Sequence, residues 1–282
     1  MQAEISKIRG QFVFSGFFTA HFACFGIVLP FLPLWMEAKG IESGDVGLIL
    51  GAAYLSKVFF GNLIGALSDA TGHRKYWILA LALLNLAGFT AFSFTDSFWE
   101  MFLVWVIVGP LLTSVIPMID GLAISASRRG YITYGPVRLF GSISFILFST
   151  AVGYYLDYTS VLEVPKLMVL AAIIVVVMVL PLPDLRPRNK AGRKFAVLDV
   201  LKIPGFLPIA LIAASLQASH GALYAIGSLH WARSGLEQDV IGLLWAEGVL
   251  AEVVLFAFAA LLVRKLGVRG LFWLAASMGA FR

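Results

Sequence analysis

The stretch LILGAAYLSKVFFGNLIGAL, residues Leu48–Leu67, is long enough and apolar enough to cross a lipid bilayer as a helix. A bilayer tolerates nineteen of its twenty side chains, but Lys57 lies at its centre. Burying a lysine at that depth costs roughly 2.5–3.5 kcal/mol on the insertion scale. Some partner or function must therefore offset the cost of Lys57.

The composition of the whole chain is that of a membrane protein. Hydrophobic residues make up 60% of the 282 residues and charged residues 13%, and mean hydropathy is +0.91. Soluble domains have about 45–50% apolar and about 25% charged residues. Apolar segments recur along the length with short polar breaks, which leaves no room for a soluble domain. The net charge of +5 resides in these breaks rather than on one soluble face, which argues against nucleic-acid binding.

The apolar runs and their glycine, proline and charged boundaries predict an all-α, polytopic protein. They indicate an N-terminal six-helix bundle over 1–183, a linker over 184–204 and a partial C-terminal bundle over 205–282. The last span reaches Arg282 after about a dozen residues, so we expect a truncated or partial chain. The predicted spans lie near 11–36, 45–67, 76–95, 100–122, 138–156, 165–183, 205–230 and 240–263, with a ninth from Leu271.

The polar linkers alternate in charge. SDATGHRK, SRRGYITYG, DLRPRNKAGRK and VRKLGVRG hold most of the lysine and arginine, whereas EAKGIESGD, TDSFWE, DYTSVLE and RSGLEQD alternate with them. The positive-inside rule places the basic linkers and the N-terminus in the cytoplasm. The single cysteine, Cys24, can form neither an internal disulfide nor a zinc site, so we predict no metal and no cofactor.

Two distant segments repeat each other. GIESGDVGLILGAAYLSK starts at Gly40 and GLEQDVIGLLWAEGVLAE starts at Gly235, a spacing of 235 − 40 = 195 residues. Six predicted spans separate the two, so the repeat is parallel, which is one of the repeat plans of secondary transporters. Glycines that recur wherever membrane helices begin are the alternative explanation, but loop positions also match. The aligned pairs are Gly40 with Gly235, Glu42 with Glu237, Gly47 with Gly242, Gly72 with Gly267, and Arg74 with Arg269.

The same spacing sets Lys57 opposite Glu252. Related halves would hold both side chains at similar depth, facing a shared cavity, where opposite charges lower each other's burial cost. A carboxylate there can also take up and release a proton. The alternative is that Lys57 snorkels to an interface or forms a local structural pair. Its position about ten residues from either end of the span makes snorkelling difficult.

The loop GALSDATGHRK, Gly65–Lys75, resembles the signature loop between the second and third helices of the major facilitator superfamily. The resemblance implies two six-helix bundles that rock around a central site. Ala70 and His73 depart from the usual basic residues, so the charge network at a cytoplasmic gate is weaker. The matching positions are Gly65, Asp69, Gly72, Arg74 and Lys75.

Further stretches resemble the phenylpropionic acid transporter branch of that superfamily and extend over nearly the whole chain. They are GIVLPFLPLWMEAKGI, PMIDGLA, YGPVRLFGSISF and SLQASHGALYAIGSLHWARSGLEQDVIGLLWAEGVLAEV. The branch usually has arginine at the position of Lys57, so positive charge is retained, whereas Glu247 departs from the pattern. The resemblance implies a monomeric, multi-pass protein of a bacterial inner membrane.

Several polar residues are candidates for a site. Asp69 with Arg74, and Asp120 with Arg138, are gate ion pairs or structural pairs that close a hairpin. Histidine can relay protons or bind a substrate, and His21 in the first span resembles His220 in its placement, although a membrane histidine can also simply bond a neighbouring helix. The candidate substrate residues are Lys57, Gln217, His220 and Trp245.

These residues lead to a hypothesis of proton-coupled symport of a small organic anion such as an aromatic carboxylate. Lys57 would bind the anionic group and Glu252 would carry the proton. Open alternatives are a transporter of a neutral sugar or nucleoside, an exporter, and a non-transporting sensor or inactive fragment. An intramembrane enzyme is disfavoured because no HExxH or nucleophile motif is present. The ten-span drug and metabolite transporters are disfavoured because their repeats are inverted.

Overall fold

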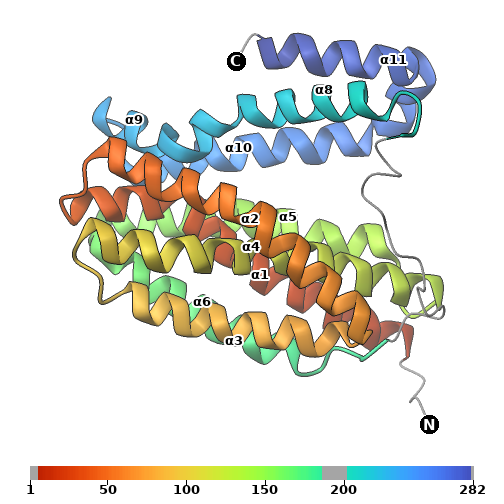
Figure 1. The fold of residues 1–282 in the computed structure, drawn as a ribbon, viewed down its shortest axis with the longest axis horizontal. Helices are drawn as coiled ribbons and strands as arrows, with labels where there is room; N and C mark the ends of the chain where they lie inside the picture. Colours follow the sequence, from red (N-terminus) through yellow and green to blue (C-terminus); the bar gives the residue numbers. More distant parts are fainter. Residues whose placement is uncertain (1–5, 186–201, 281–282) are drawn as a thin grey trace.

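The computed structural model describes residues 6–185 and 202–280, and its regular elements in those residues are helical, as predicted (Figure 1). A 3-10 turn, η1 (Val161–Glu163), leads into α6, and a π-helical segment, η2 (Leu223–Gly227), lies between α8 and α9. The α-helices are α1 (Lys7–Ala38), α2 (Ser43–Thr71), α3 (Arg74–Phe92), α4 (Phe98–Arg128), α5 (Tyr134–Tyr158), α6 (Val164–Val179), α8 (Phe206–Ser219), α9 (Ser228–Arg233), α10 (Gln238–Ala257) and α11 (Ala259–Ala280).

Seven of these helical stretches are long and apolar enough to cross a membrane: α1 to α5, Val161–Val179 and Phe206–Arg233. They match the first seven predicted spans. α1, α2 and α4 continue beyond the predicted ends, because a helix can extend past the apolar stretch into polar loop residues. Most of the predicted linker 184–204 lies outside the described residues.

The predicted eighth and ninth spans differ from the structure in their boundaries. α10 ends at Ala257 and α11 begins at Ala259, inside the span predicted over 240–263. Within α11, Gly267 has φ 66° and interrupts the helical backbone, so the turn comes before Leu271. Glycine adopts this left-handed conformation without the steric penalty of a side chain, which explains the position of the turn.

The repeat inferred from the sequence is also present in the backbone. Gly40 (φ 87°) follows the end of α1, and Gly235 (φ 86°) follows the end of α9. Gly72 (φ 70°) ends α2, and its counterpart Gly267 has φ 66°. Both pairs are 195 residues apart in the sequence, so equivalent helix ends use equivalent left-handed glycines.

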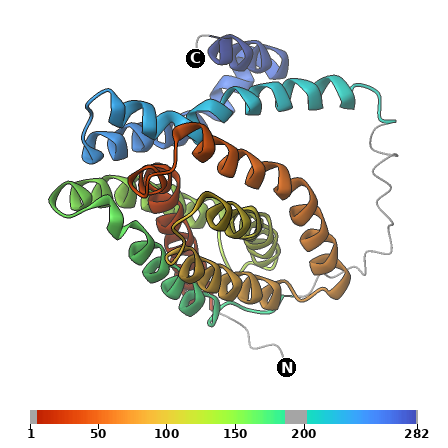
Figure 2. The same cartoon turned by 60° about the vertical axis from the view of Figure 1, so that its left-hand side comes forward.

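The N-terminal bundle, α1 to α6, is packed around α1, which lies against α5 and α6 (Figure 2). Phe17, Phe18 and Phe31 of α1 are fully buried in its core. α4 packs against α2 and α3, and α3 also contacts α6. Lipid tails are as apolar as these side chains, so in a bilayer the close van der Waals packing of the helices stabilises this core, while the backbone hydrogen bonds are formed within each helix.

Among the described residues, α10 packs against α5, and the buried contacts of the C-terminal helices lie toward one end of the N-terminal bundle. None of the described side chains of α8 is buried. We call the end that carries loops 39–42, 93–97, 159–163 and 234–237 the acidic-loop end, and the end that carries loops 72–73 and 129–133 the basic-loop end. The described residues that are buried in the C-terminal part lie toward the acidic-loop end: Ser228, Leu229, Ile241, Gly242, Trp245 and Ala246.

Candidate functional site

A pocket lies between α1, α2, α4 and the π-helical segment η2, and encloses about 510 Å³ including its open mouth. Lys57 is the one charged residue in its lining, all of which belongs to the described part of the chain. Lys57 is an exposed residue, and its side chain forms part of the wall of a largely apolar space. The lining, here called the Lys57 pocket, consists of Phe25, Val28, Leu29, Leu32, Pro33, Leu50, Ala53, Tyr54, Lys57, Trp105, Gly109, Leu112, Thr113 and Tyr224.

Few polar groups accompany the ammonium. Tyr54 lies three residues before Lys57, so both side chains share one face of α2. The Thr113 hydroxyl is 3.3 Å from the carbonyl oxygen of Gly109 and 3.2 Å from that of Pro110, and donates to them within α4. The other polar side chains of the lining are Tyr54, Tyr224 and Trp105, and the rest of the wall is mainly aliphatic and aromatic.

Tyr224 is positioned by a column of aromatic rings. It belongs to η2, and π-helical turns inside helices frequently occur at functional sites. Its ring centroid lies 5.7 Å from that of Trp245, nearly parallel, and 5.8 Å from that of His220. Trp245 is itself fixed, because its indole N–H donates to the Ser228 hydroxyl at 2.9 Å. The column presents Tyr224 to the pocket from the C-terminal half.

The four predicted substrate residues lie in different surroundings. Lys57 lines the pocket, whereas Trp245 is buried behind Tyr224. His220 contacts Tyr224, and its Nδ1 lies 2.9 Å from the carbonyl oxygen of Leu216. Gln217 is exposed on α8 and is not in the lining. Tyr224 was missed in the sequence, although it follows His220 by four residues and therefore shares its helix face.

Lys57 and Glu252 do not meet in this conformation. Glu252 is exposed on the second half of α10 and does not line the Lys57 pocket. Lys57 and Glu252 both belong to the described residues, and no ion pair joins their side chains there. The predicted coupling of Lys57 and Glu252 stays a prediction.

The four predicted gate residues lie in two pairs toward the basic-loop end. An Arg74 guanidinium nitrogen is 3.0 Å from the Asp69 carboxylate. Arg138 Nε is 3.9 Å from Asp120, but the closer partner of Asp120 is the Tyr134 hydroxyl, which donates to it at 2.9 Å. Tyr134 precedes Arg138 by four residues, which puts both on one face of α5.

Arg138 is also held by an aromatic ring. Its guanidinium lies 4.2 Å from the ring centroid of Phe22 on α1, within cation–π distance. Asp120 on α4, Arg138 on α5 and Phe22 on α1 therefore join three helices. A gating role for this group remains a prediction.

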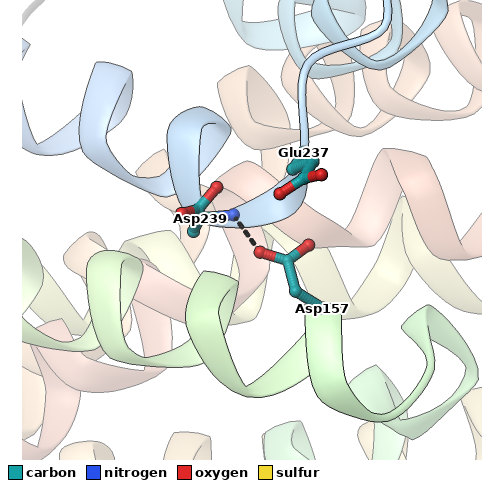
Figure 3. Close-up of side chains that lie close together, drawn as sticks. All are labelled: Asp157, Glu237 and Asp239. Atoms are coloured by element: carbon teal, nitrogen blue, oxygen red, sulfur yellow. Dashed lines mark hydrogen bonds between the residues drawn. The ribbon is translucent and has the colours of Figure 1, made fainter.

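A carboxylate of α5 caps α10 at the acidic-loop end (Figure 3). Asp157 accepts hydrogen bonds from the backbone N–H groups of Gln238 and Asp239, each at 2.9 Å. These are among the first N–H groups of α10, which have no partner within the helix. The helix dipole favours a negative charge there. The carboxylates of Glu237 and Asp239 lie within 4.8 Å of that of Asp157, so the cap also brings like charges together.

Two further contacts join the halves at this end. A Cβ at Gly242 would lie 2.2 Å from the carbonyl oxygen of Ser149, and one at Gly153 would lie 2.4 Å from that of Gln238. Only glycine allows α5 and α10 to approach this closely. Arg233 Nε donates to the Glu37 carboxylate at 2.8 Å. The two halves are therefore closed against each other at the acidic-loop end.

Comparison with known proteins gives a consistent result. The model of the MFS_1 like family matches residues 12–282. The probable 3-phenylpropionic acid transporter of Escherichia coli (strain K12) is 28% identical over 272 residues, covering 95% of this chain and 71% of the relative. Lactose permease of Citrobacter freundii is 31% identical over 136 residues, covering 45% and 33%. The crystal structure of the nucleoside transporter NupG superposes with a TM-score of 0.74 at 15% identity, covering 93% and 69%, a likeness of fold alone.

Proposed function

We propose that this chain, which belongs to the MFS_1 like family of membrane transporters, takes up a small organic anion together with protons by alternating access. The observation that carries the proposal is the Lys57 pocket, whose lining combines one lysine with apolar and aromatic side chains. A small amphipathic anion is complementary to such a lining.

An aromatic carboxylate would use both features of the pocket. Its carboxylate would accept a charge-assisted hydrogen bond from the Lys57 ammonium. Its ring would pack against Phe25, Trp105 and Tyr224, which line the same space. The likeness to a probable 3-phenylpropionic acid transporter supports this class of substrate.

A sugar or nucleoside is the second candidate, favoured by the likeness to lactose permease and to NupG. Such solutes carry several hydroxyl groups, and each one left without a partner in a desolvated site costs about 1–3 kcal/mol. The polar side chains of the lining besides Lys57 are Tyr54, Tyr224, Trp105 and Thr113, and the Thr113 hydroxyl donates within α4. The scarcity of polar groups in the lining favours the anion.

In this proposal Glu252 carries the coupling proton. The repeat assigns it the same depth as Lys57, and a carboxyl group that is protonated crosses an apolar region without a net charge. Because Glu252 is exposed on the second half of α10, it would approach the pocket only when the halves rock. With the basic loops in the cytoplasm of a bacterial inner membrane, as the positive-inside rule suggests, the closed acidic-loop end faces outward.

Direct binding to the purified protein tests the anion assignment. We expect 3-phenylpropionate to bind and its uncharged amide to bind at least about tenfold more weakly, since a hydrogen bond to a charged group contributes about 1.5–3 kcal/mol. Lys57→Gln should remove this preference and Lys57→Arg should retain it. Equal binding of acid and amide, or tighter binding of lactose or a nucleoside, would overturn the assignment.

A further inference from the structure

A second cavity lies inside the N-terminal bundle, where α1, α3, α4 and α6 meet, and we call it the His21 cavity. It lies directly behind the Lys57 pocket, because Leu112 lines both spaces. Phe25, which lines the Lys57 pocket, also contacts the His21 ring, with centroids 5.2 Å apart. The lining of the His21 cavity is His21, Cys24, Ala82, Asn85, Phe89, Leu112, Val115, Ala172 and Val175.

Two deeply buried polar side chains line this cavity, and each has buried polar atoms without a hydrogen-bond partner among the described residues. His21 is 1% exposed, and neither of its ring nitrogens is bonded. Asn85, from α3, is 4% exposed, and its Oδ1 is unpaired. Buried polar groups in proteins are nearly always hydrogen-bonded, because leaving one unsatisfied is costly. Their joint presence at one cavity indicates a shared ligand.

The chemistry of the lining limits what that ligand can be. Apart from His21, Asn85 and the Cys24 thiol, the walls are apolar and contain no carboxylate. The Arg138 guanidinium lies over the ring of Phe22, the chain neighbour of His21, and this nearby positive charge disfavours a cation. The cavity has room for about one water molecule, and cavities that stay empty are apolar ones. A small neutral group that can both donate and accept hydrogen bonds meets these conditions.

We propose that the His21 cavity is a hydration site, in which one ordered water bridges the His21 imidazole on α1 and the Asn85 amide on α3. An uncharged imidazole offers one donor and one acceptor nitrogen, and water can pair with either while donating to the amide oxygen. The bridge links α1 to α3 immediately behind the wall of the Lys57 pocket. This inference does not depend on the identity of the transported solute.

Thermal unfolding of the purified protein tests the bridge, because Asn85→Leu should lower the apparent Tm if a water bridges the site and raise it if none does. Asn85→Leu removes one partner, so a bridged site predicts an apparent Tm that is lower by roughly 2–4 °C. In the double variant His21→Phe with Asn85→Leu, the loss should be smaller than the sum of the single losses. Asn62→Leu is the matched control, because Asn62 is exposed on α2 and donates only to the Val58 carbonyl. A higher Tm for Asn85→Leu would overturn the proposal.

Radiolytic hydroxyl-radical labelling measures the water directly and does not depend on stability. Cys24 is 1% exposed and Met36 is 0% exposed, and both lie on α1 and belong to the same core cluster, but Cys24 lines the His21 cavity and Met36 does not. A bound water predicts that Cys24 is oxidised several-fold faster than Met36 after correction for intrinsic reactivity. The double variant should reduce this ratio toward one. Equal protection of Cys24 and Met36 in the unsubstituted protein would contradict the hydration site.

Discussion

α2 and α10 begin with the two copies of the sequence repeat, yet their equivalent residues have different surroundings. Gly242 of α10 is packed against the Ser149 carbonyl so closely that a Cβ would lie 2.2 Å away, whereas a Cβ at Gly47 of α2 would meet only Ile226, at 3.8 Å. Lys57 of α2 and its counterpart Glu252 are both exposed, but Lys57 lines a pocket and Glu252 does not.

This difference shows what a repeat does and does not specify. The left-handed turns at Gly40 and Gly235 are equivalent because both end a helix that precedes a repeated segment. The requirement for glycine at Gly242 arises instead from α5, which packs against α10. Equivalent positions therefore share backbone conformation, and their neighbours determine what each side chain does.

The largest expected effect is at Lys57, the repeat position that faces the pocket. Lys57→Gln removes the charge that would pair with a carboxylate, so we expect the affinity for an aromatic carboxylate to fall about 10–150-fold. Glu252→Gln should leave equilibrium binding within about twofold, because Glu252 does not line the pocket. Titration of both variants with one ligand measures the contrast, and equal losses would show that the two positions act alike.

The second prediction compares the two repeat glycines. Gly242→Ala forces α10 away from α5, and overpacking of this kind costs about 1–3 kcal/mol. We expect closure at the acidic-loop end to weaken about 5–150-fold. Gly47→Ala, the matched control, should have little effect.

Spin labels attached at Phe94 and Leu236 in a Cys24→Ser background would report this closure, because both side chains are exposed near the acidic-loop end. Gly242→Ala should lengthen or broaden the distance distribution between the labels. An unchanged distribution for Gly242→Ala, or an equal change for Gly47→Ala, would contradict the role assigned to the close approach.

A smaller effect is expected from the cap on α10. Asp157→Ala removes the acceptor for the N–H groups of Gln238 and Asp239, which typically costs about 1 kcal/mol. Hydrogen exchange of these amides should accelerate about fivefold. Asp157→Asn keeps one side-chain oxygen and should have an intermediate effect. Exchange that is insensitive to both substitutions would show that the cap contributes nothing to the closed end.

The smallest effect is expected from the ion pair between Glu37 and Arg233. Arg233 is 60% exposed, and exposed pairs contribute about 0.2–1 kcal/mol. A double-mutant cycle of Glu37→Gln and Arg233→Gln, followed by thermal unfolding in low and in high salt, should give a coupling energy in this range that shrinks with salt. If the coupling energy of the ion pair exceeds the free energy that Asp157→Ala removes, the ion pair is the stronger contact and the proposed order is wrong.

The sequence predicted the scaffold well, because apolar length and loop charge determine membrane spans almost independently of tertiary contacts. The hairpin that brings Asp120 near Arg138 also followed from the sequence, since a short connection joins α4 and α5. Tyr54 is three residues from Lys57, and this spacing places it on the face that lines the pocket.

Other features depend on contacts that sequence patterns do not contain. The π-helical hydrogen bonds of η2 change the direction in which Tyr224 leaves the helix axis. Hydropathy does not distinguish a π-helical turn from an α-helical one, so the sequence did not predict this change. The Asp157 cap joins residues 81 positions apart, from two different halves. The repeat assigned Lys57 and Glu252 a common depth, but depth does not determine which way a side chain points.

The proposed proton-coupled uptake of an organic anion is tested most directly by the external pH of lightly buffered cells that express the protein. Addition of 3-phenylpropionate should raise the external pH as protons enter with the anion, and Glu252→Gln should abolish the rise while the variant remains folded in the membrane. An external pH that does not change with wild-type protein, or a rise that persists unaltered in Glu252→Gln, would contradict the account.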